Sequence, residues 1–325
     1  MTMLEEAVER VSGFFGKDNV YIAASSALRD PILEAQIVPE ANVWSEPTRR
    51  NTLGGHCWVA ANLAANDLAD ASVAVLTADH LIGDTEQFLG SLGAALDIAE
   101  MTSGIVTIGI EPTRPETGYG YIEVDDSNTV TSAKGRLAYR AHSFREKPSA
   151  DTADRFLEAG NFLWNSGMFI YTLPTFKQEL EKAQPAAYES VGQIAEALKK
   201  GDLSQATASF EDLPNISIDY AVMEKAERVF VVRSDFKWDD VGTWDAMERT
   251  RELDPNGNVV EGRVLTFDSH NCVVISQHPD LTVGVLGLSN MVVVASDESV
   301  LVCHKNDVQR VWHLARMDVE LRKTL

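Results

Sequence analysis

Two acidic residues that lie far apart in the chain are the side chains best suited to chemistry. Asp79 stands in the segment TADH (residues 77–80), and Asp240 stands in the segment WDDVGTW (residues 238–244). Each acid follows a predicted strand, and two such carboxylates brought together by a fold can hold a magnesium ion against phosphate oxygens. The pair therefore predicts phosphoryl or nucleotidyl transfer. The alternative is that Asp79 caps a turn and Asp240 is a solvated loop acid.

Further polar residues interrupt or follow predicted strands and could contact a ligand. Asn165 begins the segment NSG inside an otherwise apolar strand, which suggests close approach of a ligand or a simple β-bulge. Gly118 and Gly120 bracket Tyr119, and glycine leaves backbone amides accessible, although a plain turn is the alternative. Glu and Lys at residues 146–147 follow another predicted strand and could contact a ligand. The alternative is an ordinary solvated ion pair on the surface, which contributes little to stability.

Composition limits the classes of partner. Lys and Arg number 28 against 49 Asp and Glu, so the 325-residue chain carries a net charge of −21. Such a surface repels nucleic acid and anionic lipid, and a phosphate site would need local Lys, Arg or metal compensation. Three cysteines argue against a disulfide framework and fit a reducing cytosol. No apolar run approaches the roughly 18 residues of a membrane span, so we expect a cytoplasmic protein without membrane or nucleic-acid partners.

The elements that must position these residues alternate between strands and helices. The run at 72–77 (SVAVLT) predicts a parallel strand buried on both faces, and residues 104–109 predict another. Asp84 is expected to cap a helix that ends near residue 101. This alternation predicts an α/β sheet of the Rossmann type, mixed and mostly parallel, in which ligands bind beyond the carboxyl ends of strands. Asp79 lies at such an end.

The remaining predicted elements complete the same pattern. Strands are expected at 19–24, 41–45, 119–124, 142–146, 162–171 and 228–233, and helices at 4–11, 26–36, 52–66, 151–159, 174–200 and 217–226. Thr52 is a plausible helix cap, and Thr243 is expected to open another helix. Short β runs from residue 258 to about 304 recur at spacings of roughly 10 residues, which predicts an all-β module or solenoid before a terminal helix at 308–325. We therefore expect two domains, 1–255 and 256–325.

Seven segments together resemble the mannose-1-phosphate guanylyltransferases, also called GDP-mannose pyrophosphorylases. In chain order they are EP with RNT (46–52), TADH (77–80), TGYGYI (117–122), FREKP (144–148), WNSGMF (164–169), SIDYAVMEK (217–225) and WDDVGTW (238–244). Each segment alone is a weak signal, but their order and spacing are similar to the family from about residue 4 to the end of the chain.

The resemblance implies a fold, a reaction and roles. It implies a nucleotidyltransferase domain, a C-terminal left-handed β-helix and a homodimer. The implied reaction converts GTP and mannose 1-phosphate to GDP-mannose and pyrophosphate with Mg²⁺. Asp79 and Asp240 would hold the metal, with Asp239 the less suitable acid. Lys147 would pair with the sugar phosphate during catalysis, while Glu146 and Asn165 would bind sugar hydroxyls.

The remaining implied positions lie around the substrates. Gly118, Tyr119 and Gly120 would contact the sugar or phosphate. Arg50 and Asn51 would lie near the nucleotide, although Arg50 could simply offset local acids. Asp219 and Tyr220 match family positions that we interpret as structural.

The chain also departs from the family pattern. The family begins with a strand and a Gly-Gly-x-Gly-x-Arg loop that cradles the triphosphate, whereas this chain starts where the following helix would begin. Leu53 and Gly54 stand where the family usually has Ala-Pro. We expect an N-terminally truncated form of an ordinary enzyme. The alternatives are a catalytically impaired paralogue that binds sugar phosphate or serves as a regulatory subunit, an unrelated replacement for the loop, and a pyrophosphorylase for another nucleotide sugar.

Overall fold

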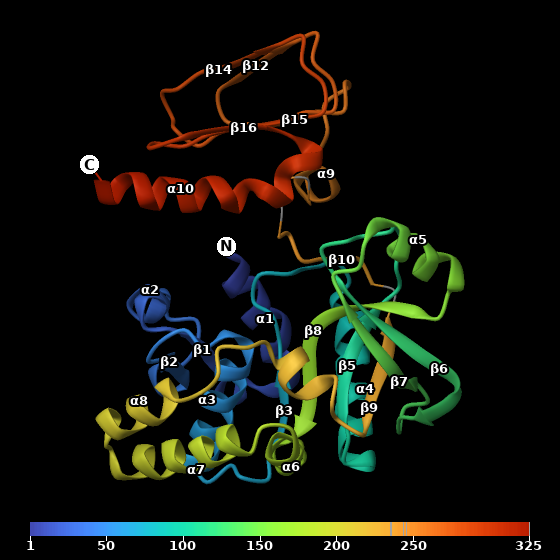
Figure 1. Ribbon diagram of the computed structural model, residues 1–325, viewed down its shortest axis with the longest axis vertical. Helices are drawn as coiled ribbons and strands as arrows, with labels where there is room; N and C mark the ends of the chain where they lie inside the picture. The colour runs from blue at the N-terminus through green and yellow to red at the C-terminus, as the bar shows by residue number, and fades with distance from the viewer. Residues whose placement is uncertain (235, 243, 245, 325) are drawn as a thin grey trace. The chain divides into compact units, whose positions relative to one another are not determined.

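The computed structural model describes residues 1–234, 236–242, 244 and 246–324, and its contacts divide the chain into two units (Figure 1). The first unit is Met1–Trp238 and the second is Asp239–Leu325. This division falls earlier in the chain than the boundary expected near residue 255. The helix start expected at Thr243 lies outside the described residues.

A six-stranded sheet forms the centre of the first unit. Its spatial order is β3 (Ser72–Val75), β8 (Phe162–Thr172), β5 (Ile105–Ile110), β9 (Val229–Ser234), β7 (Leu137–Glu146) and β6 (Gly120–Thr131). The mixed α/β sheet is confirmed, but the expectation of mostly parallel pairing is wrong. β5 and β9 pair in parallel, whereas the β3–β8, β8–β5, β9–β7, β7–β6 and β6–β8 pairs are antiparallel.

The apolar run at 72–77 was expected to be a strand buried on both faces, and the structure corrects this. β3 lies at the edge of the six-stranded sheet, and its residues are exposed or only partly buried. The reason is that β8, from much later in the chain, runs antiparallel between β3 and β5. β3 and β5 keep the common direction that their helical crossover requires, but they are not neighbours.

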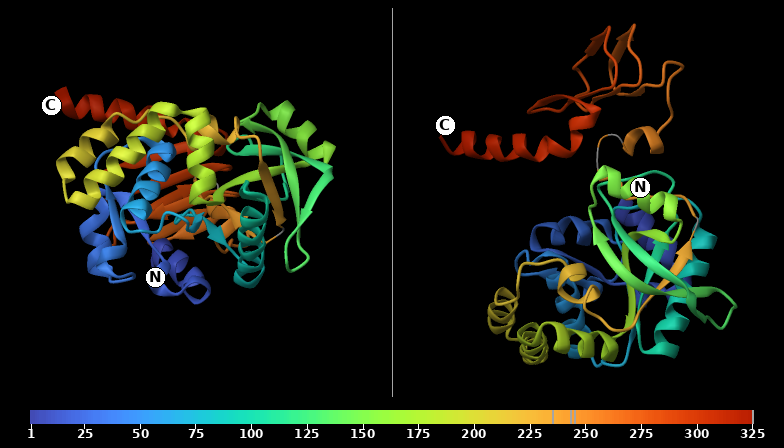
Figure 2. Two further views of the ribbon diagram at one scale, coloured as in Figure 1. Left: turned by 90° about the horizontal axis from the view of Figure 1, so that it is seen from below. Right: turned by 45° about the vertical axis from the view of Figure 1, so that its right-hand side comes forward.

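Helices cover both faces of the sheet. α4 (Thr85–Thr102) packs on one face, and Asp84 caps it as predicted, since its carboxylate accepts the Gln87 N–H at 3.0 Å. The opposite face carries α3 (Asn51–Ala65) and α6 (Leu173–Ala183), with α7 (Pro185–Lys200) and α8 (Leu203–Glu211) outside them (Figure 2). The single helix expected over 174–200 is broken at Pro185, which cannot continue a helix.

The remaining elements of the first unit precede or flank the sheet. They are α1 (Met3–Phe15), β1 (Ile22–Ser25), α2 (Arg29–Ala35), β2 (Val43–Glu46), β4 (Leu81–Ile82), α5 (Ala150–Ala159) and β10 (Trp238–Asp239), at which the unit ends. β1 and β2 pair in parallel as a separate two-stranded sheet. No described helix is both long enough and apolar enough to cross a bilayer.

The second unit is a small parallel β-solenoid, as the repeated β runs predict. β11 (Val259–Glu261), β13 (Val273–Ser276) and β15 (Met291–Ala295) stack in parallel on one side, and β12 (Val264–Phe267) pairs with β14 (Val283–Leu286) on another. β16 (Val300–His304) pairs antiparallel with β15, and the predicted terminal helix is α10 (Val311–Thr324). A short helix, α9 (Ala246–Thr250), precedes the solenoid.

Candidate functional site

The ends of β6 and β7 bring a carboxylate against a glycine. Glu146 is the last residue of β7 and lies opposite Gly120, the first residue of β6. A Cβ atom on Gly120 would lie 2.6 Å from Oε2 of Glu146, so any larger residue there would displace the carboxylate. The same Cβ would also approach Asn165 of β8, at 3.4 Å. Glu146, Gly120 and Asn165, three predicted site residues, therefore lie together.

Hydrogen bonds fix the amide of Asn165 at both ends. Its Oδ1 accepts the Gly167 N–H at 3.2 Å, and its Nδ2 donates to Oδ1 of Asp219 at 2.8 Å. The β5–β8 register shifts beside Asn165, and Gly167 has a φ of 70°, so the β-bulge considered for this segment is present. The second amide hydrogen of Asn165 remains available to a ligand.

Asp219 is a site residue that the sequence interpretation missed. It opens a one-turn π-helix, η4 (Asp219–Met223), and we had interpreted it as structural. The Thr52 hydroxyl accepts the N–H of Ile218 at 2.8 Å, so the start of α3 holds the residue before Asp219. The expectation that Thr52 caps α3 is wrong, because Arg50 is the N-cap residue and Thr52 serves the loop instead. An Asp at a helix start resembles an ordinary cap, so the match of the segment SIDYAVMEK to the family was the available signal.

The carboxylates of this cluster are harder to ionise than usual. Burial raises the pKa of Asp219, against the opposing effects of its hydrogen bond from Asn165 and of Lys147. Burial also raises the pKa of Glu146, and the nearby Asp219 and Glu224 raise it further, while Lys147 lowers it. The Lys147 Nζ lies 3.8 Å from Oε1 of Glu146. Lys147 therefore lies beside acids that can accept hydrogen bonds from hydroxyls.

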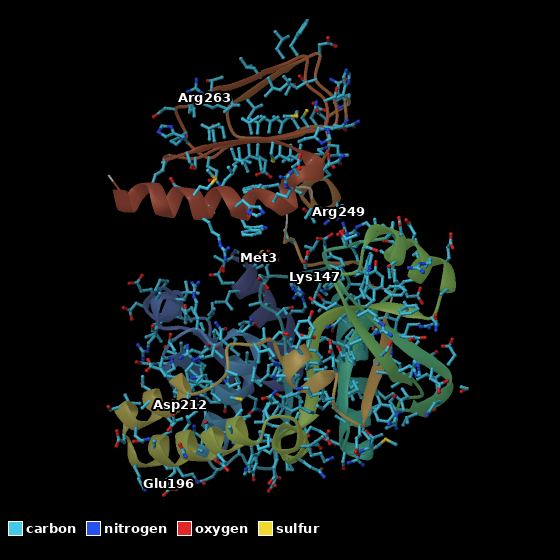
Figure 3. The ribbon with its side chains drawn as sticks, in the orientation of Figure 1. Met3, Lys147, Glu196, Asp212, Arg249 and Arg263 are labelled. Carbon is cyan, nitrogen blue, oxygen red and sulfur yellow. The ribbon has the colours of Figure 1, made fainter. Side chains whose placement is uncertain are left out.

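Lys147 has an unusual backbone conformation. Its φ is 45°, in the left-handed region that non-glycine residues rarely adopt, and its N–H donates to the carbonyl of Tyr119 at 3.2 Å. Backbone strain of this kind concentrates at functional sites. The side chain remains largely exposed at the end of β7 (Figure 3), where it could meet an anion.

The loop before β6 is held by a charged pair that the sequence interpretation did not single out. Glu116 accepts hydrogen bonds from Nε of Arg114 and from the N–H of Gly118, both at 3.1 Å. The guanidinium of Arg114 lies 4.9 Å from the Trp164 ring centroid, and the Tyr119 and Trp164 rings are 5.2 Å apart. The Gly118 amide is thus already hydrogen-bonded within the protein. The guanidinium of Arg114 lies against the rings of Tyr119 and Trp164.

The segments TADH (77–80) and WDDVGTW (238–244) are in contact through His80 and Trp238, both of which belong to the first unit. Nε1 of Trp238 donates to Nδ1 of His80 at 3.2 Å, and the two rings meet edge to face. Nε2 of His80 lies 3.9 Å from Oδ1 of Asp79, whose side chain is 83% exposed. Asp79 is therefore accessible to an ion or a phosphate. Asp240 belongs to the second unit, and its pairing with Asp79 stays a prediction.

The acids beside Trp238 differ in their surroundings. Asp239 is buried and forms an ion pair with Arg249, with contacts of 2.5 and 3.1 Å. Its Oδ1 also accepts the Val241 N–H, and Asp240 accepts the Gly242 N–H, each at 3.0 Å. Val241 has a φ of 49°, which is strained for a β-branched residue. These contacts give Asp239 a structural role and present Asp240 on a fixed turn.

Arg50 and Asn51 lie at the start of α3. Arg50 donates through Nε and Nη2 to the carbonyl of Glu211, at 3.0 and 2.6 Å, and so satisfies the end of α8. Asn51 has a φ of 55°, and its Oδ1 accepts the Thr52 N–H at 2.8 Å. Both residues therefore have structural contacts, and their expected role near a nucleotide stays a prediction.

Among the described residues, no group of three or more His, Cys, Asp or Glu side chains is arranged to hold a metal ion. Carboxylates at Asp79 and Asp240 would supply two ligands at most. Mg²⁺ accepts this arrangement, because it is commonly bound by one or two carboxylates together with substrate phosphates and water. The exposed carboxylate of Asp79 is therefore compatible with such an ion, and its sharing with Asp240 stays a prediction.

Comparison with protein families gives two matches along the chain. Residues 24–256 match the nucleotidyl transferase family, and residues 262–316 match the mannose-phosphate isomerase/GMP-like β-helix domain. The two matched segments follow one another in the order of the α/β sheet and the solenoid.

Relatives and solved structures are similar over most of the chain. The alginate biosynthesis protein AlgA of Pseudomonas aeruginosa is 37% identical over 87% of this chain and 58% of its own length. A mannose-1-phosphate guanylyltransferase of Salmonella montevideo is 33% identical over 95% of this chain and 65% of its own length. The chain thus spans less than two thirds of these relatives. A crystal structure of mannose-1-phosphate geranyltransferase from Thermus thermophilus is 33% identical, with a TM-score of 0.81 over 98% of this chain and 89% of that chain.

Proposed function

Because the chain belongs to the nucleotidyl transferase family, we propose that it transfers a guanylyl group from GTP to mannose 1-phosphate, giving GDP-mannose and pyrophosphate. Relatives named mannose-1-phosphate guanylyltransferase support this substrate pair. In this reaction an oxygen of the sugar phosphate attacks the α-phosphorus, so the protein needs to position two anions and offset their charge.

The observation that carries the proposal is the cluster of Glu146, Lys147, Asn165 and Asp219. Acceptor carboxylates beside a fixed amide suit the hydroxyls of a sugar, because hydroxyls can donate to one and accept from the other. A lysine at the rim suits the attached phosphate. In a chain of net charge −21, this local cation supplies the compensation that an anionic substrate needs.

Magnesium is proposed to assist with the nucleotide. When bound, the ion would neutralise phosphate charge as the new bond forms. Asp79 would be one ligand, since its carboxylate is exposed and its loop is fixed through His80 and Trp238. Asp240 would be the second ligand.

Arg50, Asn51 and the loop at Gly118–Gly120 are proposed to contribute to the substrate pockets. We also propose a homodimer in the cytoplasm, as the family resemblance and the scarcity of cysteine suggest.

A second candidate is sugar-phosphate binding without turnover. The observation in its favour is that Arg50 and Asn51, the residues expected near the nucleotide, are both engaged in structural contacts. A pyrophosphorylase for another nucleotide sugar is a further alternative within the same family.

The experiment is pyrophosphate release from GTP and mannose 1-phosphate with Mg²⁺, using the 325-residue chain. We expect release that depends on both substrates and on magnesium. Calorimetric titration with mannose 1-phosphate runs in parallel, and a panel of other nucleotides and sugar phosphates tests specificity. Binding without release would replace our proposal by the second candidate, and neither binding nor release from folded protein would overturn both.

A further inference from the structure

Trp238 contacts the segment of the first unit that carries Asp79. Its indole donates to Nδ1 of His80 at 3.2 Å, and the two rings meet edge to face with centroids 5.3 Å apart. Trp238 is only 7% exposed, whereas the side chain of Asp79, next to His80, is 83% exposed. A buried ring therefore lies behind an accessible acid.

The same indole packs against the rings beside the residues proposed to bind the sugar. Its centroid lies 5.1 Å from that of Tyr119 and 6.4 Å from that of Trp164. Tyr119 directly precedes Gly120, and Trp164 directly precedes Asn165. Trp238 thus borders both the Asp79 side and the sugar side of the candidate site.

Backbone contacts fix Trp238 beside the segment that follows Asp79. The Gly83 N–H donates to the carbonyl of Lys237 at 2.8 Å. A Cβ atom on Gly83 would lie 2.8 Å from the Cβ of Lys237, so a larger residue there would push the two segments apart. The position of the indole is therefore set by its own backbone as well as by the rings around it.

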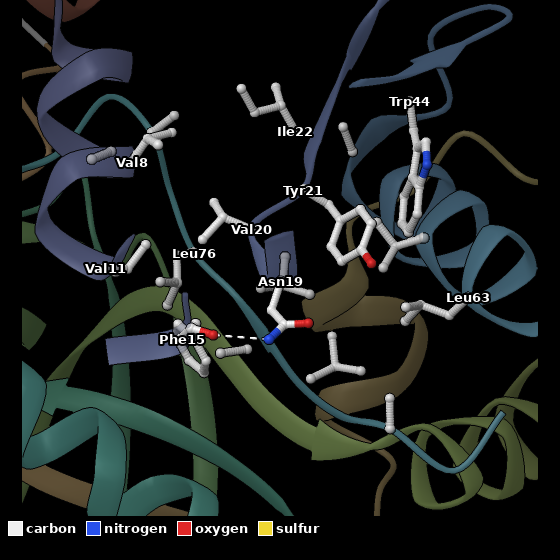
Figure 4. A pocket seen from close by; sticks show the side chains of 18 of the residues that line it. Val8, Val11, Phe15, Asn19, Val20, Tyr21, Ile22, Trp44, Leu63 and Leu76 are labelled. Atoms are coloured by element: carbon white, nitrogen blue, oxygen red, sulfur yellow. Dashed lines mark hydrogen bonds between the residues drawn. The ribbon is translucent and has the colours of Figure 1, made fainter. Parts of the chain in front are cut away.

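The segment that precedes Asp79 has little packing on one side. Residues 72–78 line an apolar cavity of about 480 Å³, and Figure 4 shows Leu76 among the side chains around it. Side chains that face a cavity lose the dispersion contacts that would otherwise hold them. The position of Asp79 therefore depends on the contacts of the residues that follow it, of which His80 is the first.

The hydrogen bond from Trp238 determines which nitrogen of His80 carries a hydrogen. An indole N–H can only donate, so Nδ1 of His80 is the acceptor and carries no hydrogen. The one ring hydrogen of a neutral imidazole is then on Nε2. Nε2 is also the nitrogen that lies 3.9 Å from Oδ1 of Asp79. The indole thus directs an imidazole N–H toward the carboxylate.

The separation between His80 and Asp79 allows the carboxylate to be oriented without being occupied. A distance of 3.9 Å is longer than a direct hydrogen bond. The exposed carboxylate can close it by rotation, or a water molecule can bridge the two groups. In both cases the N–H orients one oxygen of Asp79 and leaves the other oxygen to a ligand.

From these contacts we propose that Trp238 and His80 are positioning residues that act in series on Asp79. The indole orients the imidazole, and the imidazole orients the carboxylate; we call this arrangement the Trp238–His80 relay. Because the indole also packs against Tyr119 and Trp164, the relay fixes the distance between Asp79 and the sugar-binding residues. The inference rests on the role proposed above for Asp79.

Pyrophosphate release by substituted chains tests the relay. Trp238→Phe keeps an aromatic ring in place but removes the N–H donor. We expect kcat to fall about tenfold and the KM for mannose 1-phosphate to stay unchanged, because a misplaced Asp79 alters the alignment for reaction and not the sugar contacts. Trp58→Phe is the matched control, since Trp58 is also buried, at 5% exposed, but its Nε1 has no partner among the described residues. It should retain the wild-type kcat.

Substitutions of His80 distinguish its N–H group from its ring. His80→Phe keeps a ring against Trp238 but can neither donate nor accept, so kcat should again fall about tenfold. His80→Gln should retain more activity, because its amide supplies an N–H toward Asp79. The double variant with Trp238→Phe should lose no more than His80→Phe alone, since groups that act in series are not additive. Additive losses, or equal losses in His80→Gln and His80→Phe, would overturn the relay.

Nuclear magnetic resonance tests the hydrogen bond without any substrate. In the isotope-labelled whole chain, we expect a scalar coupling across the hydrogen bond between Nε1 of Trp238 and Nδ1 of His80, with the ring hydrogen on Nε2. His80→Phe removes the signals of His80 and so assigns them. A hydrogen on Nδ1, or the absence of a coupling to the indole, would contradict the inference.

The two measurements separate the relay from the proposed function. No pyrophosphate release from the folded, unsubstituted chain would overturn the proposed function, and the coupling between Trp238 and His80 would then decide about the relay. Normal release by both Trp238→Phe and His80→Phe would overturn the relay and leave the proposed function standing.

Discussion

At the scale of single residues, Glu146 is the side chain most directly suited to recognise a sugar. Replacing Glu146 by Gln keeps its shape but removes the charge that two hydroxyl donors would meet. We expect the KM for mannose 1-phosphate to rise about tenfold or more, with the KM for GTP unchanged, because a hydrogen bond to a charged group contributes about 1.5–3 kcal/mol. Steady-state kinetics of pyrophosphate release measures both constants.

The matched control is Glu123→Gln, in the same hairpin, where the carboxylate accepts the Ser143 hydroxyl at 2.8 Å. It should leave both constants unchanged. An effect of Glu146→Gln confined to GTP would contradict the sugar-binding role.

Asp219 acts through Asn165, and its substitution should reveal that. Asp219→Asn replaces the charged acceptor of the Asn165 amide by a neutral amide oxygen, which weakens that hydrogen bond by about 1 kcal/mol, so kcat/KM for mannose 1-phosphate should fall about fivefold. Asp212→Asn, exposed at the end of α8, is the control. Equal losses in both variants would mean a general structural effect.

The pKa of Asp219 gives a second readout of the same variant. Its folded pKa is raised above the ordinary 3.8, so the wild type loses stability as the pH rises from 3.8 through the folded value. Asp219→Asn should remove this loss. Urea unfolding of both proteins across that range measures the difference, and identical pH profiles would argue against a buried carboxylate.

At the scale of elements, Arg50 contacts the end of α8, so a structural role and a nucleotide-binding role can be distinguished by experiment. If Arg50 is structural, Arg50→Gln should lower the free energy of unfolding by about 1–2 kcal/mol and leave the KM for GTP unchanged. Urea denaturation and kinetics distinguish the roles. Arg49→Gln, at an exposed neighbouring position, is the control. A raised KM for GTP with normal stability would support the proposed nucleotide role.

The elements were largely predictable from periodicity and caps, whereas their neighbours in space were not. Asp84 and the apolar run at 104–109 predicted α4 and β5 correctly, because local hydrogen bonding and burial determine them. The sequence of β3 resembles that of a central strand because β3 lines an apolar cavity. An edge strand in this position carries the same apolar residues as a strand buried on both faces. Asp219 was missed because its partner, Asn165, lies on a strand far away in sequence. Pairings of this kind depend on chain topology, which local patterns do not encode.

At the scale of the whole molecule, a buried histidine links stability to pH. His56 lies in the core of the first unit, where its Nδ1 is 2.8 Å from the Tyr171 hydroxyl, and burial lowers its pKa from 6.5 to about 4. A depressed pKa means that the stabilisation is present above pH 6.5 and is lost as the pH falls toward about 4. The loss is about 3 kcal/mol over this window.

His56→Gln should abolish that part of the acid sensitivity, since glutamine does not titrate but can still meet the tyrosine hydroxyl. Urea unfolding at about pH 7 and at about pH 4 measures it, and the gap between variant and wild type should change by about 3 kcal/mol between the two conditions. His142→Gln, at an exposed position, should retain the wild-type profile. A wild-type profile for His56→Gln would place the acid sensitivity in other groups.

The reversed direction of β16 has a consequence for how this protein can vary over evolution. β13 lies parallel on β11 and β15 lies parallel on β13, but β16 runs antiparallel to β15 and closes the stack. A further parallel coil cannot follow a reversed strand in the same register. The solenoid can therefore lengthen or shorten only by whole coils ahead of β15, and its size should change among relatives in discrete steps while the closing strand is kept.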